Sequence, residues 1–332
     1  MALTRRTLLR GAAAGALALP MLAACGQVTV TTDEAEAPAA PAEPAKLRIG
    51  DLPLIDMLPV YVAQQEGLFP ENLEVELVPF SSALERDTAY ISKQVDGVLN
   101  DFVSATALNR DQDFTRNVRV ILRSTPQLSL FALIAGKDSG IEKLEDVKGK
   151  QIAISPNTII EYVLDRMLGT VGLGHDDVEK LAVPSIPLRL EMINQGNVTA
   201  AVLPEPLVTL SIATAGTLLI RDDAETQFGA SLLSFRSEVI ANHEDTVRGF
   251  MNGFEAGVNR INSNPGNYQD LMEARGRIPP PLFGKFSVPT FPEAAVVPQA
   301  EFEAVGEWAV ERGLLQEAIP YEKLVDTRFL PG

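Results

Sequence analysis

Residues 144–158 decide the fold, and they read Leu-Glu-Asp-Val-Lys-Gly-Lys-Gln-Ile-Ala-Ile-Ser-Pro-Asn-Thr. The run at 150–154 has the apolar character of a short strand, and the Ser-Pro-Asn-Thr turn at 155–158 opens a helical pattern from about Ile159. The same strand-turn-helix order has already appeared upstream of this stretch. A pattern that restarts in this way predicts two α/β lobes of similar layout rather than one long sheet.

Strand and helix patterns alternate on both sides of residues 144–158. The strands that the sequence predicts span 47–50, 73–78, 95–99, 118–122, 150–154, 181–183 and 200–203. The predicted helices lie near 58–66, after Ser81 and Ser82, and near 159–168, 189–195, 243–262 and 302–309. Alternation at this spacing is typical of mainly parallel sheets flanked by helices.

The charge balance excludes one class of partner. The chain carries 28 Lys and Arg against 44 Asp and Glu, which gives a formal net charge of −16. A nucleic-acid-binding protein needs a basic face, so we expect no nucleic-acid partner. A small anionic ligand stays open, because local dipoles rather than the net charge set the preference of a pocket.

The first residues have the composition of an export signal. A basic stretch up to Arg10 precedes an apolar run at 11–24, which is shorter than the about 20 residues needed to span a membrane. This order predicts a signal peptide over residues 1–24. The sequence Leu-Ala-Ala-Cys-Gly at 22–26 resembles the lipobox of bacterial lipoproteins, which implies lipidation of Cys25, and residues 4–9 resemble the twin-arginine export signature.

Cys25 is the only cysteine, so the chain cannot form an internal disulfide. Residues 25–45 are rich in Thr, Ala, Glu and Pro, a composition that buries too little apolar surface to fold. We therefore expect the lipidated Cys25 to be followed by a disordered tether. Because no later apolar run is long enough to span a membrane, the lipid is the one membrane contact that we expect.

Residues for enzyme chemistry are scarce in this sequence. Its two histidines, His175 and His243, lie in a polar turn and at the start of a helical pattern. No Gly-x-Ser-x-Gly elbow, phosphate-binding Gly-rich loop or metal-ligand spacing occurs. We therefore expect no catalytic residue, no cofactor and no metal site, and the sequence favours binding over catalysis.

Polar residues begin several predicted helices directly after strands. Ligands of open α/β sheets bind beyond the carboxyl ends of strands, and a helix N-terminus offers free N–H groups to an anion or a carbonyl oxygen. The turns with this character are 51–58, 80–84, 155–159 and 185–189. Ordinary helix capping explains each turn as well. Arg189 is either a ligand-facing cation or an exposed helix residue, and Asp101 either binds the ligand or caps a helix.

Several short motifs, taken together and in this order, resemble one family. They are Leu-Pro-Val-Tyr-Val-Ala at 58–63, Glu-Gly-Leu-Phe at 66–69, Arg86-Asp87, Val-Asp-Gly at 95–97, the stretch 144–155, Gly196, and Ala-Ala-Val-Leu-Pro-Glu-Pro at 200–206. From Lys46 to about Asn262 the chain resembles the solute-binding proteins of ABC importers of the nitrate, sulfonate, taurine and thiamine-pyrimidine type.

This resemblance implies a two-lobe α/β fold of the periplasmic-binding type II class, in which each lobe is a mainly parallel sheet flanked by helices and two hinge crossovers join the lobes. It places lobe 1 at 46–134 and 223–332, and lobe 2 at 135–222. A ligand would lie in the cleft, and hinge closure would present a docking surface to the permease. The cleft residues that the resemblance implies are Asp56, Met57, Ser81, Ser82, Asp101, Phe102, Ser155, Asn157, Thr158, Arg189 and Glu205.

Two differences from other members of the family that the chain resembles bear on the nature of the solute. Residues 52–57 differ from the Trp-x-Pro-Asn-x-x-His-like pattern of thiamine-pyrimidine members, and the single tryptophan, Trp308, lies in the tail. We therefore expect a small oxyanion-bearing solute such as an alkanesulfonate or nitrate. We expect a monomer, anchored on the outer face of the membrane or on its periplasmic side, that delivers the solute to an ABC permease. A ligand-sensing lipoprotein and a same-fold enzyme of the menaquinone-precursor dehydratase type stay open as alternatives.

Overall fold

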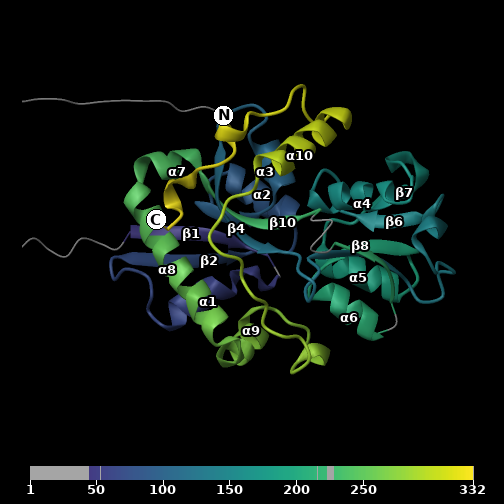
Figure 1. Ribbon diagram of the computed structural model, residues 1–332, viewed down its shortest axis with the longest axis horizontal. Helices are drawn as coiled ribbons and strands as arrows, with labels where there is room; N and C mark the ends of the chain where they lie inside the picture. The colour runs from purple at the N-terminus through teal and green to yellow at the C-terminus, as the bar shows by residue number, and fades with distance from the viewer. Residues whose placement is uncertain (1–44, 53, 215, 223–227, 332) are drawn as a thin grey trace, which may run out of the picture. The chain divides into compact units, whose positions relative to one another are not determined.

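Two five-stranded sheets, each with helices packed around it, form the part of the chain that the computed structural model describes (Figure 1). The described residues are 45–52, 54–214, 216–222 and 228–331. The predicted signal peptide, Cys25 and the predicted tether up to residue 44 lie outside them.

The first sheet has the strand order β2-β1-β3-β10-β4. Its strands are β1 (Ala45–Asp51), β2 (Leu73–Pro79), β3 (Gly97–Asn100), β4 (Thr115–Arg123) and β10 (Ala230–Arg236). β1 pairs in parallel with both β2 and β3, whereas β10 is antiparallel to β3 and to β4.

The second sheet repeats this plan in the order β7-β6-β8-β5-β9. Its strands are β5 (Phe131–Ala135), β6 (Gln151–Ile154), β7 (Glu179–Ala182), β8 (Ala200–Pro204) and β9 (Thr217–Arg221). β6 pairs in parallel with β7 and β8, and β5 is antiparallel to β8 and β9.

Four strands of each sheet thus run in one direction and the fifth runs in the opposite direction. The opposing strand, β5 or β10, is the one that enters from the other sheet, because the chain crosses between β4 and β5 and again between β9 and β10. The expected two-lobe fold is confirmed, with sheets that are mixed at these two strands. The predicted boundary between residues 134 and 135 falls inside β5, and the lobe boundaries themselves stay predictions.

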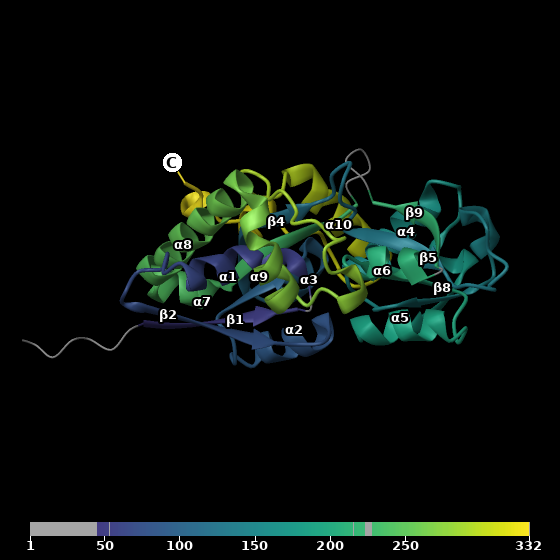
Figure 2. The same ribbon diagram turned by 90° about the horizontal axis from the view of Figure 1, so that it is seen from below.

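Ten α-helices surround the sheets in the described residues (Figures 1 and 2). They are α1 (Leu58–Gln65), α2 (Ala83–Ile91), α3 (Phe102–Leu108), α4 (Ile159–Gly169), α5 (Ile186–Asn194), α6 (Leu207–Thr214), α7 (Ser237–Asn242), α8 (Glu244–Ser263), α9 (Gln269–Arg275) and α10 (Gln299–Glu311). Short 3-10 turns lie at Ile55–Met57, Leu144–Val147, His175–Asp177, Pro265–Tyr268, Pro280–Leu282, Tyr321–Lys323 and Thr327–Phe329.

Burial along each element follows its sequence pattern. The edge strand β2 alternates half-buried with largely exposed positions, as its alternating apolar and acidic residues predict. The inner strands β8 and β10 are buried throughout. Helix α8 packs one apolar face on α1, and Gly257 permits this approach because a Cβ there would collide with the backbone carbonyl of Pro59.

Three strands were absent from the sequence prediction: β5, β9 and β10. Each is a short apolar run without clear alternation, and such a run does not distinguish a strand from a buried helical turn. All three are antiparallel partners around the crossovers, so their pairing depends on residues far away in the chain.

Candidate functional site

Loops at the carboxyl ends of strands from both sheets line one cavity, here called the cleft cavity. Its charged or polar lining residues are Asp56, Arg86, Asn100, Asp101, Ser155, Thr158, Arg189, Glu205 and Ser231. Ligands bind at this edge in open α/β sheets. The cleft cavity has a volume of about 60 Å³, far below the roughly 300–1,000 Å³ of common ligand pockets. In this arrangement the two sheets therefore leave little room between them.

The structure brings six of the predicted site residues together in this lining. They are Asp56, Asp101, Ser155, Thr158, Arg189 and Glu205. Capping and lining coincide at two of them, because Asp101 caps α3 and Thr158 caps α4.

Five predicted site residues do not line the cleft cavity, namely Met57, Ser81, Ser82, Phe102 and Asn157. Met57 and Phe102 are buried in the hydrophobic core. Ser82 caps α2 by accepting from the Glu85 amide at 3.2 Å, and the Ser81 hydroxyl donates to the Glu85 carboxylate at 2.8 Å. Local hydrogen bonding thus occupies the two serines.

Arg189 is the buried cation of the site, with a side chain that is 0% exposed. Its Nε donates to the Val202 carbonyl at 3.1 Å and its Nη1 to the Val183 carbonyl at 3.0 Å. Its Nη2 has no hydrogen-bond partner among the described residues. Burial, with no neighbouring carboxylate to oppose it, lowers the pKa of Arg189 to about 10. The expectation of a ligand-facing cation fits this environment, and the alternative of an exposed helix residue is wrong.

Two acidic side chains in the same lining, Asp56 and Glu205, have raised pKa values. Burial raises the pKa of Asp56 to about 7, although the Ser231 hydroxyl opposes the shift. Burial likewise raises the pKa of Glu205 to about 7, against hydrogen bonds from the Thr209 amide and hydroxyl at 3.0 and 2.9 Å. A carboxyl group with such a pKa is partly protonated near neutral pH, so it donates a hydrogen bond as readily as it accepts one.

Arg86 also lines the cleft cavity, but its hydrogen bonds are directed into the protein. Its Nη1 donates to the Leu99 carbonyl at 2.8 Å and its Nη2 to the Ser104 hydroxyl at 2.9 Å, and the guanidinium pairs with Asp87 at 2.7 Å. These contacts tie α2 to β3 and α3. Arg86 therefore shapes the wall of the cavity, whereas Arg189 has a free donor.

Asn100 is a lining residue that the sequence did not single out. Its Oδ1 accepts from the Ser234 hydroxyl at 2.9 Å, and the same hydroxyl lies 2.6 Å from Asn117 Oδ1. Because a hydroxyl has one proton, it satisfies only one of these oxygens at a time. Asn100 Nδ2 is buried without a partner in the described residues. The Asn100 amide thus keeps an unused hydrogen-bond donor in the cavity lining, and only the end position of β3 hinted at this.

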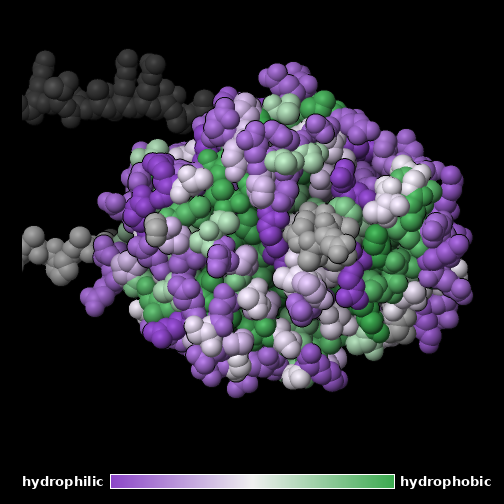
Figure 3. All heavy atoms as spheres, viewed as in Figure 1, coloured by the Kyte–Doolittle hydropathy of each residue, from purple (hydrophilic) through white to green (hydrophobic). Residues whose placement is uncertain are grey.

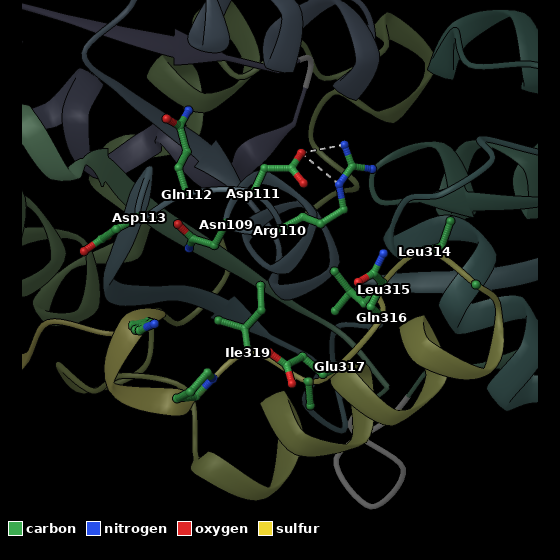
Figure 4. A pocket seen from close by; sticks show the side chains of 14 residues that line it. Asn109, Arg110, Asp111, Gln112, Asp113, Leu314, Leu315, Gln316, Glu317 and Ile319 are labelled. Atoms are coloured by element: carbon green, nitrogen blue, oxygen red, sulfur yellow. Dashed lines mark hydrogen bonds and ion pairs between the residues drawn. The ribbon is translucent and has the colours of Figure 1, made fainter.

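A larger cavity of about 590 Å³ lies elsewhere, between the turn at 109–113 and the tail at 313–320 (Figure 4). Its lining is polar, and its Arg110 is already paired with Asp111 at 2.8 Å. Figure 4 shows these side chains spread around an open hollow rather than converging on one point. We therefore place the candidate site in the smaller cleft cavity, where buried groups lack partners.

Other kinds of site find no support in the described part of the chain. Neither His175 nor His243 lines the cleft cavity, and the residues from 45 onward that the structure describes hold no group of three or more His, Cys, Asp or Glu arranged for a metal ion. Among those same residues no helix has the length and apolar character to cross a membrane. Figure 3 shows hydrophilic and hydrophobic side chains interspersed on one face of the molecule.

The site geometry and the sequence motifs agree with a known family. A family model described as NMT1/THI5 like matches residues 55–267, which is more than half of the chain. The chain belongs to the NMT1/THI5-like family. The matched range includes every residue of the cleft lining named above, so the resemblance that the motifs carried is confirmed at the level of the family.

One curated relative of this NMT1/THI5-like chain is a protein of Haemophilus influenzae whose name assigns it to thiamine biosynthesis. The two are 31% identical over 134 residues, a match that covers 39% of this chain and 40% of the relative. The chain thus spans about two fifths of the length of the relative that it matches.

Solved structures share the fold of this NMT1/THI5-like protein. The ligand-binding component of an ABC-type import system from Staphylococcus aureus has a TM-score of 0.72 and 14% identity, covering 86% of this chain and 97% of that one. The periplasmic aliphatic sulphonate-binding protein of Escherichia coli has a TM-score of 0.70 and 16% identity, with 87% and 94% covered. The desulfurization enzyme DSZB gives 0.62 and 15%, with 86% and 97% covered. At these identities the likeness establishes the fold, which binding proteins and an enzyme share.

Proposed function

We propose that this protein is the solute-binding component of an ABC importer and that it captures a small oxyanion-bearing solute, such as an alkanesulfonate or nitrate, in the cleft cavity. In this proposal Arg189 receives the negative charge of the solute. Asn100, Ser155 and Thr158 supply further hydrogen bonds from both sides of the cleft. The chain shares its fold with an importer component and with a sulphonate-binding protein, and this likeness supports the proposed class of function.

The free Nη2 of the buried Arg189 carries the proposal. Taking a charged group out of water is costly unless an opposite charge compensates it, and no carboxylate of the described chain pairs with this guanidinium. A fold that keeps such a group has an anion-binding position ready for a ligand that arrives from outside. The planar fork of Arg suits the paired oxygens of a sulfonate, nitrate or carboxylate.

The acidic lining is compatible with an anionic solute. Asp56 and Glu205 have a pKa of about 7 because they are buried. In its protonated form each carboxyl group donates a hydrogen bond to an oxyanion instead of repelling it. Capture of the anion then favours the protonated form further, since binding and protonation are linked.

Access to the site requires movement. A volume of about 60 Å³ is too small to hold most solutes, so in this proposal the lobes separate to admit the ligand and close around it by hinge motion. Closure stabilised by the ligand would give the permease a conformation to recognise. A sensor that reports to a membrane receptor would use the same motion, and a permease and ATPase encoded beside this gene would favour the importer.

We also propose that the protein is exported and held at the membrane surface by a lipid on Cys25. Export and lipid anchoring are supported by three features of the sequence: the basic start, the apolar run at 11–24 and the residues around Cys25. Two or more acyl chains give stable anchoring. A same-fold enzyme is the second candidate, because the lining contains the carboxyl groups Asp56 and Glu205 with a pKa of about 7, although it contains no His, Cys or Lys.

A thermal-shift screen of a soluble form that starts near Gln27 tests the proposed function. The panel contains nitrate, sulfate, taurine, alkanesulfonates, thiamine pyrimidines, riboflavin and amino acids. A ligand at 100 times its Kd adds about 2.7 kcal/mol, which raises the Tm by roughly 4 °C for a protein of this size. A shift with a sulfonate or nitrate supports the proposal. Shifts confined to cationic or neutral solutes would contradict the assignment of the anion to Arg189.

A further inference from the structure

The C-terminal helix α10 is anchored on the first sheet and reaches the second. The segment leading into α10 is held on β4, where the Val120 amide donates to the Ala295 carbonyl at 2.8 Å. Arg123 of the same strand pairs with Glu301 in the first turn of α10 at 2.9 Å. In both ribbon views α10 lies beside α3 and extends toward α4 of the second sheet (Figures 1 and 2). We call α10 with Arg312 the strap.

The far end of the strap holds α4 through two polar contacts. Trp308 Nε1 donates to Asp165 Oδ2 at 3.0 Å, and Arg312 Nη2 donates to Glu161 Oε1 at 2.9 Å. The Trp308 ring also meets the Tyr162 ring edge-on, with centroids 5.4 Å apart. Helix α10, which is anchored on the first sheet, is thereby bound to helix α4 of the second sheet.

Glu161 connects the strap to the cleft cavity. Its Oε1 accepts from Arg312 and from Lys180, each at 2.9 Å, while its Oε2 accepts from the Asn157 amide at 2.8 Å. Asn157 has a left-handed backbone with φ of 58° and lies between Ser155 and Thr158, which both line the cavity. The carboxylate of Glu161 is therefore hydrogen-bonded to the turn 155–158 at its left-handed residue, a conformation that Asn adopts more readily than most residues.

The charges in this cluster are balanced and poorly accessible to water. Lys180 bridges Glu161 and Asp165 at 2.9 and 2.6 Å, so two carboxylates face the two cations Lys180 and Arg312. The side chains of Glu161 and Asp165 are only 5% and 9% exposed. Removal of one cation leaves a buried carboxylate without full compensation, which strongly destabilises the closed arrangement.

We propose that the strap stabilises the two lobes in the closed arrangement. In this proposal Glu161 is a positioning residue for the ligand site, because its carboxylate binds Arg312 through one oxygen and the turn 155–158 through the other. This inference rests on the proposed function only in taking the cleft cavity as the ligand site. The contacts between the strap and α4 would therefore have to break before a solute could enter, and they would slow its release once they had formed again.

Two readouts without any ligand test the proposal. Exposed Ile91 on α2 and Ile212 on α6 are replaced by Cys for spin labels, and Cys25, the only native cysteine, is replaced by Ser. Electron–electron distance measurements then report the separation of the lobes. Amide hydrogen exchange of the peptide that contains Asn157 reports the turn. Because no solute is involved, a flat ligand panel and a failed strap experiment are separate outcomes.

Arg312→Ala is the main variant, with Arg312→Lys as the conservative variant and Arg110→Ala, at an exposed pair, as the matched control. We expect Arg312→Ala to shift the distances to longer values and to speed exchange at Asn157 by roughly tenfold or more. Arg312→Lys should restore most of both signals, and Arg110→Ala should match the parent. Unchanged distances, unchanged exchange or a failure of lysine to rescue would overturn the proposal.

If Arg312→Ala does not fold, Trp308→Phe serves the same purpose. It keeps an aromatic ring against Tyr162 and removes the hydrogen bond to Asp165. We expect a smaller shift in the same direction in both readouts. A distance distribution equal to that of the parent would overturn the latch.

Discussion

Arg312 of α10 and Glu161 of α4 are 151 positions apart in the sequence, and their Nη2 and Oε1 atoms lie 2.9 Å apart in the fold. Arg189, in contrast, is more deeply buried and has no carboxylate partner in the described residues. Arg312 thus pairs with a carboxylate inside a charge cluster, whereas Arg189 is the residue to which we assign the negative charge of the proposed solute. The Arg312 side chain is 24% exposed, whereas that of Arg189 is 0% exposed, so the two arginines are tested by different experiments.

Arg189→Ala should abolish most of the affinity for an anionic solute. Hydrogen bonds to charged groups contribute about 1.5–3 kcal/mol, so the Kd should rise roughly 10- to 100-fold or more. Arg189→Lys keeps the charge but loses the planar fork, and we expect an intermediate Kd. Titration calorimetry with the best solute of the panel measures both, with Arg110→Ala as the control. An unchanged Kd in Arg189→Ala would remove this residue from the site.

Glu205 should make stability depend on pH in the free protein. Its pKa is about 7 in the fold against an ordinary 4.5, because it is buried. Between these values the folded state keeps a proton that the unfolded state has released, so the free energy of unfolding falls as the pH rises. The full difference amounts to about 3 kcal/mol and is lost above about pH 7.

Glu205→Gln stays neutral at every pH and should flatten this decline. Urea unfolding at about pH 5 and about pH 8 measures the change. Part of the decline should persist, since burial also gives Asp56 a pKa of about 7. The exposed Glu142→Gln is the control. A slope in Glu205→Gln as steep as that of the parent would show that Glu205 is ionised in the free protein.

Gly97→Ala should destabilise the first sheet. A Cβ at this position in β3 would lie 2.6 Å from ring atoms of Phe235 on β10 and 3.0 Å from Ile49 on β1. Overpacking of this kind costs about 1–3 kcal/mol. Gly169→Ala, at the end of α4 with no atom within 4 Å of the new Cβ, is the matched control and should cost nothing. Equal urea midpoints for the two variants would contradict the tight packing of β3.

Cys25→Ser should release the protein from membranes. The single cysteine is the only acylation site that the lipobox resemblance provides. Acyl chains contribute about 0.8 kcal/mol per buried CH₂, so their loss should move the protein to the soluble fraction after cell fractionation. Ser81→Ala, which lies well after the leader in the sequence, should leave the distribution unchanged. Persistent membrane association of Cys25→Ser would refute the anchor.

Replacement of both Arg5 and Arg6 by Lys should block export if the twin-arginine route is used. This route reads the paired arginines themselves, so lysines that keep the positive charge should not substitute. Precursor that retains residues 1–24 should then accumulate inside the cell, as detected by mass spectrometry. Normal export of the double variant would assign the protein to the general route.

The positions of cleft residues could be predicted where they depend on strand ends. Asp101 follows β3, Ser155 follows β6 and Glu205 follows β8, and all three line the cavity. Parallel strands bring their carboxyl ends to one edge, so the α/β pattern places Ser155 and Glu205 together at one edge of the second sheet. Asp101 belongs to the first sheet, and only the tertiary arrangement of the two sheets brings it to the same cavity. Met57 and Asn157 lie in equivalent turns but are directed into the core or into local hydrogen bonds, which the pattern does not specify.

Local patterns in the sequence predicted the alternation of strands and helices, its restart in a second lobe and most of the strand-end turns, because periodicity and turn chemistry are local properties. The family was indicated separately, by the resemblance of short motifs in a fixed order. Tertiary structure alone decided that β5 and β10 run opposite to the other strands of their sheets, that Arg189 Nη2 has no partner among the residues that the structure describes, and that Arg312 hydrogen-bonds Glu161. Each of these depends on the environment that residues far apart in the chain create. Burial and pairing of charge arise only when distant segments meet, and the energy of a charge depends on that meeting rather than on its neighbours in sequence.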